Sequence, residues 1–166
     1  MTMRCFSIII ALLFFSVCFS HALAAEKAAD FTLPDINGNK VSLSAFKGKV
    51  VILNFWATWC SSCRAEMPSL NNLYNSFRDR GLVVISVSTD KSEKAVKAFA
   101  TKANLSFSVL VDKNREVSFD EYGVFGLPVT FLIDKNGLII EKFMGETEWD
   151  SGTMREKISR IIGGKK

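Results

Sequence analysis

Short apolar runs alternate along the chain with stretches of helical spacing. A continuous apolar run covers residues 50–56, which is typical of a strand that is buried on both faces. Residues 82–88 and 107–111 are also mainly apolar and predict two further strands. Between them, apolar side chains recur every three or four positions over residues 62–80 and again over residues 95–103, which predicts two helices. This alternation of strands with helices predicts an α/β fold with a mixed central sheet flanked by helices.

Two further pairs of short apolar runs each enclose an Asn-Gly turn, over residues 31–43 and 129–143. This arrangement is typical of β-hairpins. Helical spacing at residues 154–162 predicts a closing helix, and a short helix is expected near residues 116–122. The chain shows no internal repeat and no linker, so we expect a single folded domain over residues 26–166.

The start of the chain carries the pattern of a targeting segment. A basic start precedes an apolar stretch at residues 5–19, and Ala22 and Ala24 follow in Ala-x-Ala spacing. We expect a cleaved secretory signal peptide over residues 1–25, which places the folded part in the periplasm or outside the cytoplasm. An uncleaved membrane anchor is the alternative, although the apolar stretch is shorter than the ~20 residues of a spanning helix. Lipid attachment at Cys18 is a third alternative.

Composition narrows the classes of function. With 48% hydrophobic residues, 10 Gly and 3 Pro, the chain is neither a disordered tail nor a collagen-like repeat. Its formal net charge of +4 comes from 21 Lys and Arg against 17 Asp and Glu, without long basic runs. This balance argues against nucleic-acid binding as the main task. No nucleotide-binding loop or metal cluster is visible in the sequence, so we expect no cofactor and no metal.

The positions of cysteine and histidine exclude several catalytic classes. Cleavage of the targeting segment removes Cys5, Cys18 and the lone histidine, His21, and leaves Cys60 and Cys63. Ser-His-Asp hydrolysis, Cys-His proteolysis and His-ligated zinc then lack an essential group, and two thiolates do not complete a four-ligand zinc site. Covalent haem attachment is excluded as well, because arginine follows the second cysteine where that motif needs histidine.

The two remaining cysteines, Cys60 and Cys63, lie between the strand predicted at residues 50–56 and the helix that follows it. Unpaired N–H groups and the dipole at a helix N-terminus favour an anion, which lowers the pKa of a thiol there. We therefore interpret Cys60 as a redox nucleophile and Cys63 as the thiol that resolves the mixed disulfide. A purely structural disulfide is the alternative, but so short a loop gains little stability from a cross-link.

A carboxylate lies close to this pair in sequence. Glu66 follows Cys63 by three positions and so shares its helix face, and Asn54 lies in the preceding strand. Our hypothesis is that Glu66 is partly desolvated, has a raised pKa and exchanges protons with Cys63. The alternative is an exposed Glu66 that pairs with Arg64 or a lysine.

Proline and tryptophan residues add candidates for substrate contact. Pro128 follows a glycine and Leu127 at the start of an apolar strand, a setting that suits a cis peptide bond, although a trans proline at a strand start is the alternative. With a cis bond, the backbone of Leu127 is placed to pair with an extended substrate. We assign Trp56 to packing and Trp59 to the rim of the site, where it contacts an incoming peptide.

Three segments of the chain resemble one known family in the same order. Residues 54–68 (NFWATWCSSCRAEMP) resemble the active-site segment of the TlpA/ResA/CcmG-type thioredoxin-like thiol-disulfide oxidoreductases. Residues 30–49 are similar to the N-terminal hairpin of that family, and residues 126–134 (GLPVTFLID) to its cis-proline segment. The resemblance covers nearly all of residues 26–166.

The resemblance implies a thioredoxin fold with an N-terminal β-hairpin and a central αβ insertion near residues 89–118. It implies a periplasmic or membrane-tethered enzyme, kept reduced by a membrane thiol-electron transporter of the CcdA/DsbD type, with protein disulfides, including those of apocytochrome c, as substrates. By the same resemblance, Cys60 is the nucleophile, Cys63 the resolving thiol, Glu66 an acidic tuning residue and Pro128 the cis-proline.

The spacer between the cysteines departs from the common family pattern. Ser61 and Ser62 do not include the proline of many members, so the resemblance leaves the reduction potential open. They also lack the histidine that accompanies strong oxidants, which favours a reductant. A thiol peroxidase is the alternative enzyme, but peroxiredoxins carry threonine or serine where Ala57 stands, three residues before the first cysteine. The non-enzymatic alternative is a thioredoxin-like binding module that catalyses no reaction.

Overall fold

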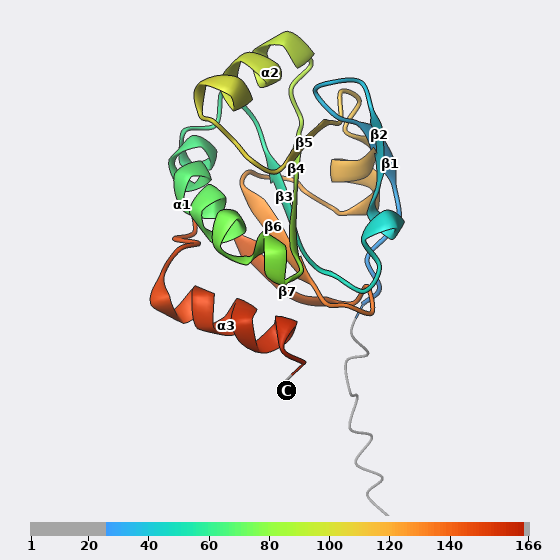
Figure 1. Ribbon diagram of the computed structural model, residues 1–166. Helices are drawn as coiled ribbons and strands as arrows, with labels where there is room; N and C mark the ends of the chain where they lie inside the picture. The colour runs from blue at the N-terminus through green and yellow to red at the C-terminus, as the bar shows by residue number, and fades with distance from the viewer. Residues whose placement is uncertain (1–25, 165–166) are drawn as a thin grey trace, which may run out of the picture.

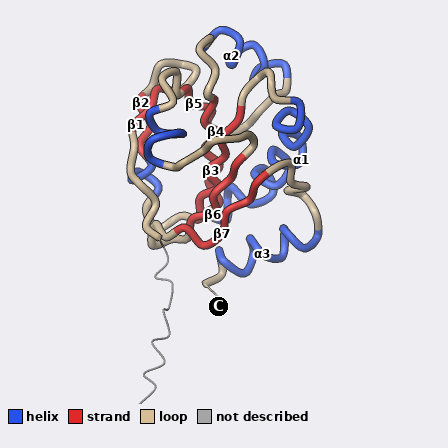
Figure 2. The backbone as a smooth tube through the Cα atoms, turned by 180° about the vertical axis from the view of Figure 1, so that it is seen from behind, coloured by secondary structure: helices blue, strands red, loops and turns tan. Residues whose placement is uncertain are grey.

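A computed structural model describes residues 26–164 and contains a five-stranded mixed sheet (Figure 1). The strand order is β5-β4-β3-β6-β7, and the view from behind shows the same arrangement (Figure 2). The β3–β4 and β4–β5 pairs are parallel, whereas β6 is antiparallel to both β3 and β7. The strands are β3 (Val50–Trp56), β4 (Leu82–Ser88), β5 (Ser108–Val111), β6 (Val129–Ile133) and β7 (Ile139–Met144).

Strand β3 is the centre of the sheet, as its continuous apolar run predicts. All seven of its residues are buried. Because side chains alternate along a strand, Ile52 and Trp56 enter one core cluster and Leu53 and Phe55 enter another on the opposite face. The sheet therefore has a packed layer on each side.

Three helices contribute to the core cluster that contains Ile52 and Trp56. They are α1 (Ser61–Phe77), α2 (Glu93–Lys102) and α3 (Gly152–Ile162). Helix α1 ends earlier than the apolar spacing predicts, because a 3-10 turn, η2 (Arg78–Arg80), follows it and Gly81 closes that turn at a φ of 103°. Glycine adopts this left-handed conformation without a steric penalty, so the chain turns directly into β4.

The opposite face is covered by the N-terminal hairpin and two short helical segments. These are β1 (Thr32–Pro34), β2 (Lys40–Ser42), the 3-10 helix η1 (Leu43–Phe46) and η3 (Glu116–Glu121). Tyr122 is the centre of an aromatic cluster on this face, with ring centroids 5.3 Å from Phe55 and 5.2 Å from Phe131. The helix expected near residues 116–122 is present, but as a single π-helical segment.

This arrangement is a thioredoxin fold with the two additions that the resemblance implies. Strands β1 and β2 form the N-terminal hairpin, and residues 89–118 contain α2, β5 and the start of η3. Among residues 26–164, no helix is long and apolar enough to cross a membrane. The signal peptide or anchor expected at residues 1–25 lies outside the described residues.

Candidate active site

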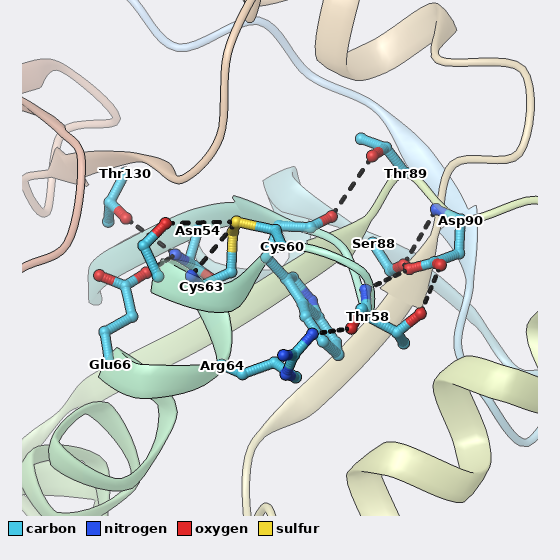
Figure 3. Close-up of a disulfide and its surroundings, with 12 residues drawn as sticks. Asn54, Thr58, Cys60, Cys63, Arg64, Glu66, Ser88, Thr89, Asp90 and Thr130 are labelled. Atoms are coloured by element: carbon cyan, nitrogen blue, oxygen red, sulfur yellow. Dashed lines mark hydrogen bonds between the residues drawn. A yellow bond between two sulfur atoms is a disulfide. The ribbon is translucent and has the colours of Figure 1, made fainter.

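Cys60 and Cys63 form a disulfide where β3 leads into α1, with their Cα atoms 5.3 Å apart (Figure 3). Cys60 is the N-cap residue of α1, and its sulfur accepts a hydrogen bond from the backbone N–H of Cys63 at 3.2 Å. Cys60 is 8% exposed, whereas Cys63 is fully buried. The sulfur at the helix N-terminus, where negative charge is favoured, is therefore the one that solvent reaches.

Glu66 is buried in α1, with only 2% of its surface exposed. Its Oε1 accepts a hydrogen bond from Asn54 Nδ2 at 2.9 Å, and its Oε2 accepts bonds from the backbone N–H of Thr147 and from Trp149 Nε1, both at 3.1 Å. Burial raises the pKa of Glu66 from its ordinary 4.5 to about 6, although these three donors act in the opposite direction. Glu66 is therefore buried and has a raised pKa, as our hypothesis requires.

Arg64 does not pair with Glu66, so the alternative of an exposed ion pair is wrong. The guanidinium Nη1 of Arg64 donates instead to the carbonyl oxygen of Thr58 at 2.6 Å. Thr58 lies two residues before Cys60, so this bond fixes the loop that carries Cys60.

A second buried carboxylate, which the sequence reasoning missed as a site residue, holds the same loop. Asp90 accepts hydrogen bonds from the backbone N–H of Thr58 at 2.8 Å, from the Thr58 hydroxyl at 2.7 Å and from the Ser88 hydroxyl at 2.7 Å. Figure 3 shows Glu66 and Asp90 on opposite sides of the disulfide. The topology of the sheet could have identified Asp90. Strands β3 and β4 are adjacent and parallel, so Thr58, which follows β3, and Asp90, which follows β4, lie at the same edge of the sheet.

Thr130, Thr147 and Trp149 are further residues that the sequence reasoning missed. Thr130 Oγ1 accepts a hydrogen bond from Asn54 at 2.9 Å. No sequence pattern identifies Thr147 and Trp149, because they lie more than 80 positions from the Glu66 carboxylate that they contact.

The peptide bond between Leu127 and Pro128 is cis. Leu127 lines a groove of about 780 Å³ together with Cys60 and Trp59. Trp59 is 69% exposed, whereas Trp56 is fully buried against Phe99, which matches their assignments to the rim and to packing. The rest of the groove is lined by residues 61–62, 89–92, 115 and 125–126.

Metal ligation has little support in the described part of the chain. No group of three His, Cys, Asp or Glu side chains within residues 26–164 could hold a metal ion. The chemistry that the site itself offers is thiol-disulfide exchange at an accessible sulfur with a buried partner sulfur and a proton-binding carboxylate nearby.

Comparisons with known proteins agree with this chemistry. The model of the AhpC/TSA family matches residues 24–142. "Thiol-disulfide oxidoreductase ResA" from Bacillus thuringiensis subsp. konkukian (strain 97-27) is 43% identical over 121 residues, which cover 73% of this chain and 69% of that protein. "Thioredoxin-like protein YneN" from Bacillus subtilis (strain 168) is 43% identical over 123 residues, which cover 72% and 71% of the two chains.

Solved structures show the same fold. The thioredoxin domain of a thiol-disulfide oxidoreductase from Bacteroides vulgatus is 30% identical, with a TM-score of 0.73, over 83% of this chain and 96% of that one. A thiol:disulfide interchange protein from Bacteroides sp. is 31% identical, with a TM-score of 0.73, over 84% and 90%. The chain therefore belongs to the AhpC/TSA family and to the ResA/CcmG-type thioredoxin-like thiol-disulfide oxidoreductases that its sequence resembles.

Proposed function

We propose that this thiol-disulfide oxidoreductase works as a reductant of disulfides in exported proteins. The observation that carries the proposal is the asymmetry of the sulfur pair: Cys60 reaches solvent at the N-terminus of α1, whereas Cys63 is fully buried behind it. A sulfur that solvent reaches at a helix N-terminus attacks a substrate, and a fully buried sulfur then releases it. The Ser-Ser spacer, which lacks the histidine of strong oxidants, supports the reducing direction.

The reaction begins with both cysteines reduced. The thiolate of Cys60 attacks one sulfur of the substrate disulfide, which forms a mixed disulfide and releases the first substrate thiolate. The thiolate of Cys63 then attacks the Cys60 sulfur, which forms the Cys60–Cys63 disulfide and releases the second substrate thiolate. Two electrons pass from the enzyme to the substrate, and the protons of the two enzyme thiols end on the two substrate thiols.

In this scheme Glu66 is the acceptor of the proton that Cys63 loses before its attack. Glu66 lies one helical turn after Cys63 on α1 and is buried, and its pKa of about 6 is close to neutrality. A group whose pKa lies near the working pH both accepts and returns a proton readily. Asn54 and Trp149 orient the carboxylate through their hydrogen bonds.

The substrate binds across the groove beside Cys60. Leu127, which precedes the cis-proline Pro128, lines this groove, and in the proposed reaction an extended peptide forms hydrogen bonds with its backbone. Trp59 supplies an exposed aromatic surface on the rim. In the proposed reaction, Cys60, Cys63, Glu66 and Pro128 are therefore catalytic, and Trp59 and Leu127 bind the substrate.

The proposal extends to location and partners. Residues 1–25 direct export or anchor the domain of residues 26–166 to the inner membrane, and a membrane thiol-electron transporter of the CcdA/DsbD type returns the enzyme to its reduced form. Apocytochrome c is the substrate that we consider first. The relatives named thiol-disulfide oxidoreductase and thiol:disulfide interchange protein support the general reaction, with protein disulfides as the substrates.

Capture of the mixed disulfide tests the proposal. A Cys63→Ser variant keeps the attacking sulfur and lacks the resolving one, so exported proteins remain linked to Cys60 and separate on addition of a reductant. The matched control is Cys60→Ser, which should capture far less. Capture of no protein by Cys63→Ser, together with failure of the unmodified protein to reduce a model disulfide, would contradict the proposed function.

A further inference from the structure

We propose that the groove beside Cys60 selects extended protein segments that carry acidic residues next to the cystine, and that Lys91 and Arg115 make this selection. The inference rests on the proposed function, because it names the class of substrate that reaches the same sulfur. Four observations on the groove carry it: its exposed aromatic walls, its charges, the fixed position of Arg115 and its continuity with Leu127.

Two exposed aromatic side chains form walls of the groove. Trp59 is 69% exposed and Phe125 is 80% exposed, and both line the groove with Cys60. Large aromatic side chains so open to solvent are costly on a protein without a partner, and they commonly mark protein contact sites. An apolar side chain beside the substrate cysteine therefore has two exposed aromatic side chains to contact.

The exposed charged side chains that line the groove are positive. Lys91 and Arg115 line it, and among the described residues neither forms an ion pair with a carboxylate. Asp90 is the acidic residue of the lining, but it is 7% exposed and its two oxygens accept the bonds from Thr58 and Ser88. An incoming acidic segment thus meets two cations that have no carboxylate partner, whereas a basic segment is repelled.

Arg115 is held in position by its backbone and by two contacts. It has a φ of 62°, which is uncommon for a residue with a side chain, and it precedes the π-helical segment η3. Its Nη2 donates to the carbonyl oxygen of Val124 at 3.4 Å, and its guanidinium lies 5.8 Å from the ring centroid of Phe119. Both π-helical turns and such strained residues cluster at functional sites.

Phe119, which contacts Arg115, also contacts Phe125 at the groove. The rings of Phe119 and Phe125 are in edge contact, with centroids 5.1 Å apart. Arg115 and Phe125 line the groove as one wall, because both contact Phe119, and Phe125 is followed in the chain by Gly126 and Leu127 on the same groove. A substrate strand that pairs with the backbone of Leu127 places the side chains beside its cysteine close to Arg115 and Phe125. The charge of those side chains therefore affects how tightly the substrate binds.

The test compares two synthetic peptides with one intermolecular disulfide each, identical except that glutamate or lysine flanks the cysteine. The second-order rate constant for reduction by the fully reduced protein is measured at low salt. We expect the acidic peptide to react about tenfold faster, and the difference to shrink as the salt concentration is raised. Equal rates, or faster reaction of the basic peptide, would overturn the inference.

Variants that change a single charge test whether Lys91 and Arg115 cause the preference for the acidic peptide. Lys91→Glu is the principal variant, because Lys91 is exposed, and it should lower the acidic-to-basic ratio about fivefold. Arg115→Gln should lower the ratio as well. The matched control is Lys49→Glu, which makes the same change in net charge at the opposite end of β3 and should leave the ratio unchanged. A ratio that Lys49→Glu changes as much as Lys91→Glu does would overturn the assignment.

A small neutral substrate separates this inference from the proposed function. If the unmodified protein reduces 2-hydroxyethyl disulfide but does not distinguish the two peptides, the selection by Lys91 and Arg115 is wrong and the oxidoreductase function stands. If it reduces neither the small disulfide nor the peptides, both proposals fall.

Discussion

Trp149 and Glu66 are separated by 83 positions in the sequence, yet the indole Nε1 of Trp149 donates a hydrogen bond to Oε2 of Glu66 at 3.1 Å. Trp149 is fully buried and also packs against Phe143, with ring centroids 5.1 Å apart. The contact joins the helix that carries the cysteines to the segment between β7 and α3. The ionisation of one active-site carboxylate is therefore coupled to the packing of the C-terminal part of the domain.

Replacement of Trp149 by phenylalanine should destabilise the protein more at pH 7 than at pH 4. The change removes a donor to a carboxylate, and a hydrogen bond to a charged group contributes about 1.5–3 kcal/mol. At pH 4 Glu66 is protonated, because its pKa is about 6, so the hydrogen bond that is lost is to a neutral carboxyl group and contributes only about 0.5–1.5 kcal/mol. Denaturant unfolding of the oxidised protein at both pH values measures the difference; an equal loss at the two values would contradict it.

Glu66 should make the stability of the protein fall as the pH rises. Its pKa is raised in the folded state from 4.5 to about 6, so the folded protein holds this proton more tightly than the unfolded chain does. The stabilising contribution is present below pH 4.5 and is lost as the pH rises through 6, a change of about 2 kcal/mol. Between pH 4 and pH 7 the unfolding free energy of the unmodified protein should fall by about 2 kcal/mol more than that of Glu66→Gln.

A control separates this carboxylate from the general effect of removing a negative charge. Glu156 lies exposed on α3, so Glu156→Gln removes the same charge outside the hydrogen-bond network of Glu66. A slope for Glu156→Gln that matches that of Glu66→Gln would show that the pH dependence does not come from the buried group.

The pH dependence of thiol reactivity tests the role of Glu66 in catalysis. If Glu66 exchanges protons with Cys63, the rate of reduction of a model disulfide should show an inflection near pH 6 that Glu66→Gln lacks, because a carboxylate with a pKa of about 6 titrates there. Stopped-flow measurements from pH 5 to pH 8 give the two profiles. Profiles of the same shape would remove the role, whatever the change in absolute rate.

The sequence predicts the elements of the fold whose signals are local. The apolar run at residues 50–56 predicts β3 because every one of its side chains is buried. The Asn-Gly turns predict both hairpins, since their short loops close within a few residues. The helical spacing at residues 154–162 predicts α3, whose Met154 and Ile158 are buried.

The parts that the sequence does not predict depend on distant contacts. The π-helical form of η3 has no local signature, and the packing of Tyr122 and Phe131 that accompanies it joins segments apart in sequence. Two polar residues, Asp90 and Ser92, lie just before α2. Ser92 does cap the helix by accepting a bond from the backbone N–H of Ala95, whereas Asp90 contacts Thr58 on another strand connection.

Removal of the Asp90 side chain should loosen the loop before Cys60. An Asp90→Ala variant leaves the part-buried N–H of Thr58 and the buried Ser88 hydroxyl without their acceptor, and an unsatisfied buried donor costs about 1–3 kcal/mol. We expect a loss of stability of about 2–4 kcal/mol and slower attack by Cys60 on a model disulfide. Asp90→Asn keeps one acceptor oxygen and should recover part of the stability and part of the rate. If Cys60 attacks the model disulfide at the same rate in the unmodified protein, Asp90→Ala and Asp90→Asn, Asp90 has no positioning role.

Reaction with peroxide distinguishes disulfide exchange from peroxidase activity within the AhpC/TSA family. Ala57 is fully buried and has no hydroxyl to contact a peroxide, whereas a peroxiredoxin carries threonine or serine at that position. We therefore expect reduced Cys60 to react with hydrogen peroxide within about tenfold of the rate of a free thiol of similar pKa. The loss of tryptophan or thiol signal after rapid mixing measures that rate, with a peptide disulfide as the positive control. If Cys60 reacts faster with hydrogen peroxide than with the peptide disulfide, the protein is a peroxidase, because its main reaction is then the reduction of peroxide and not disulfide exchange.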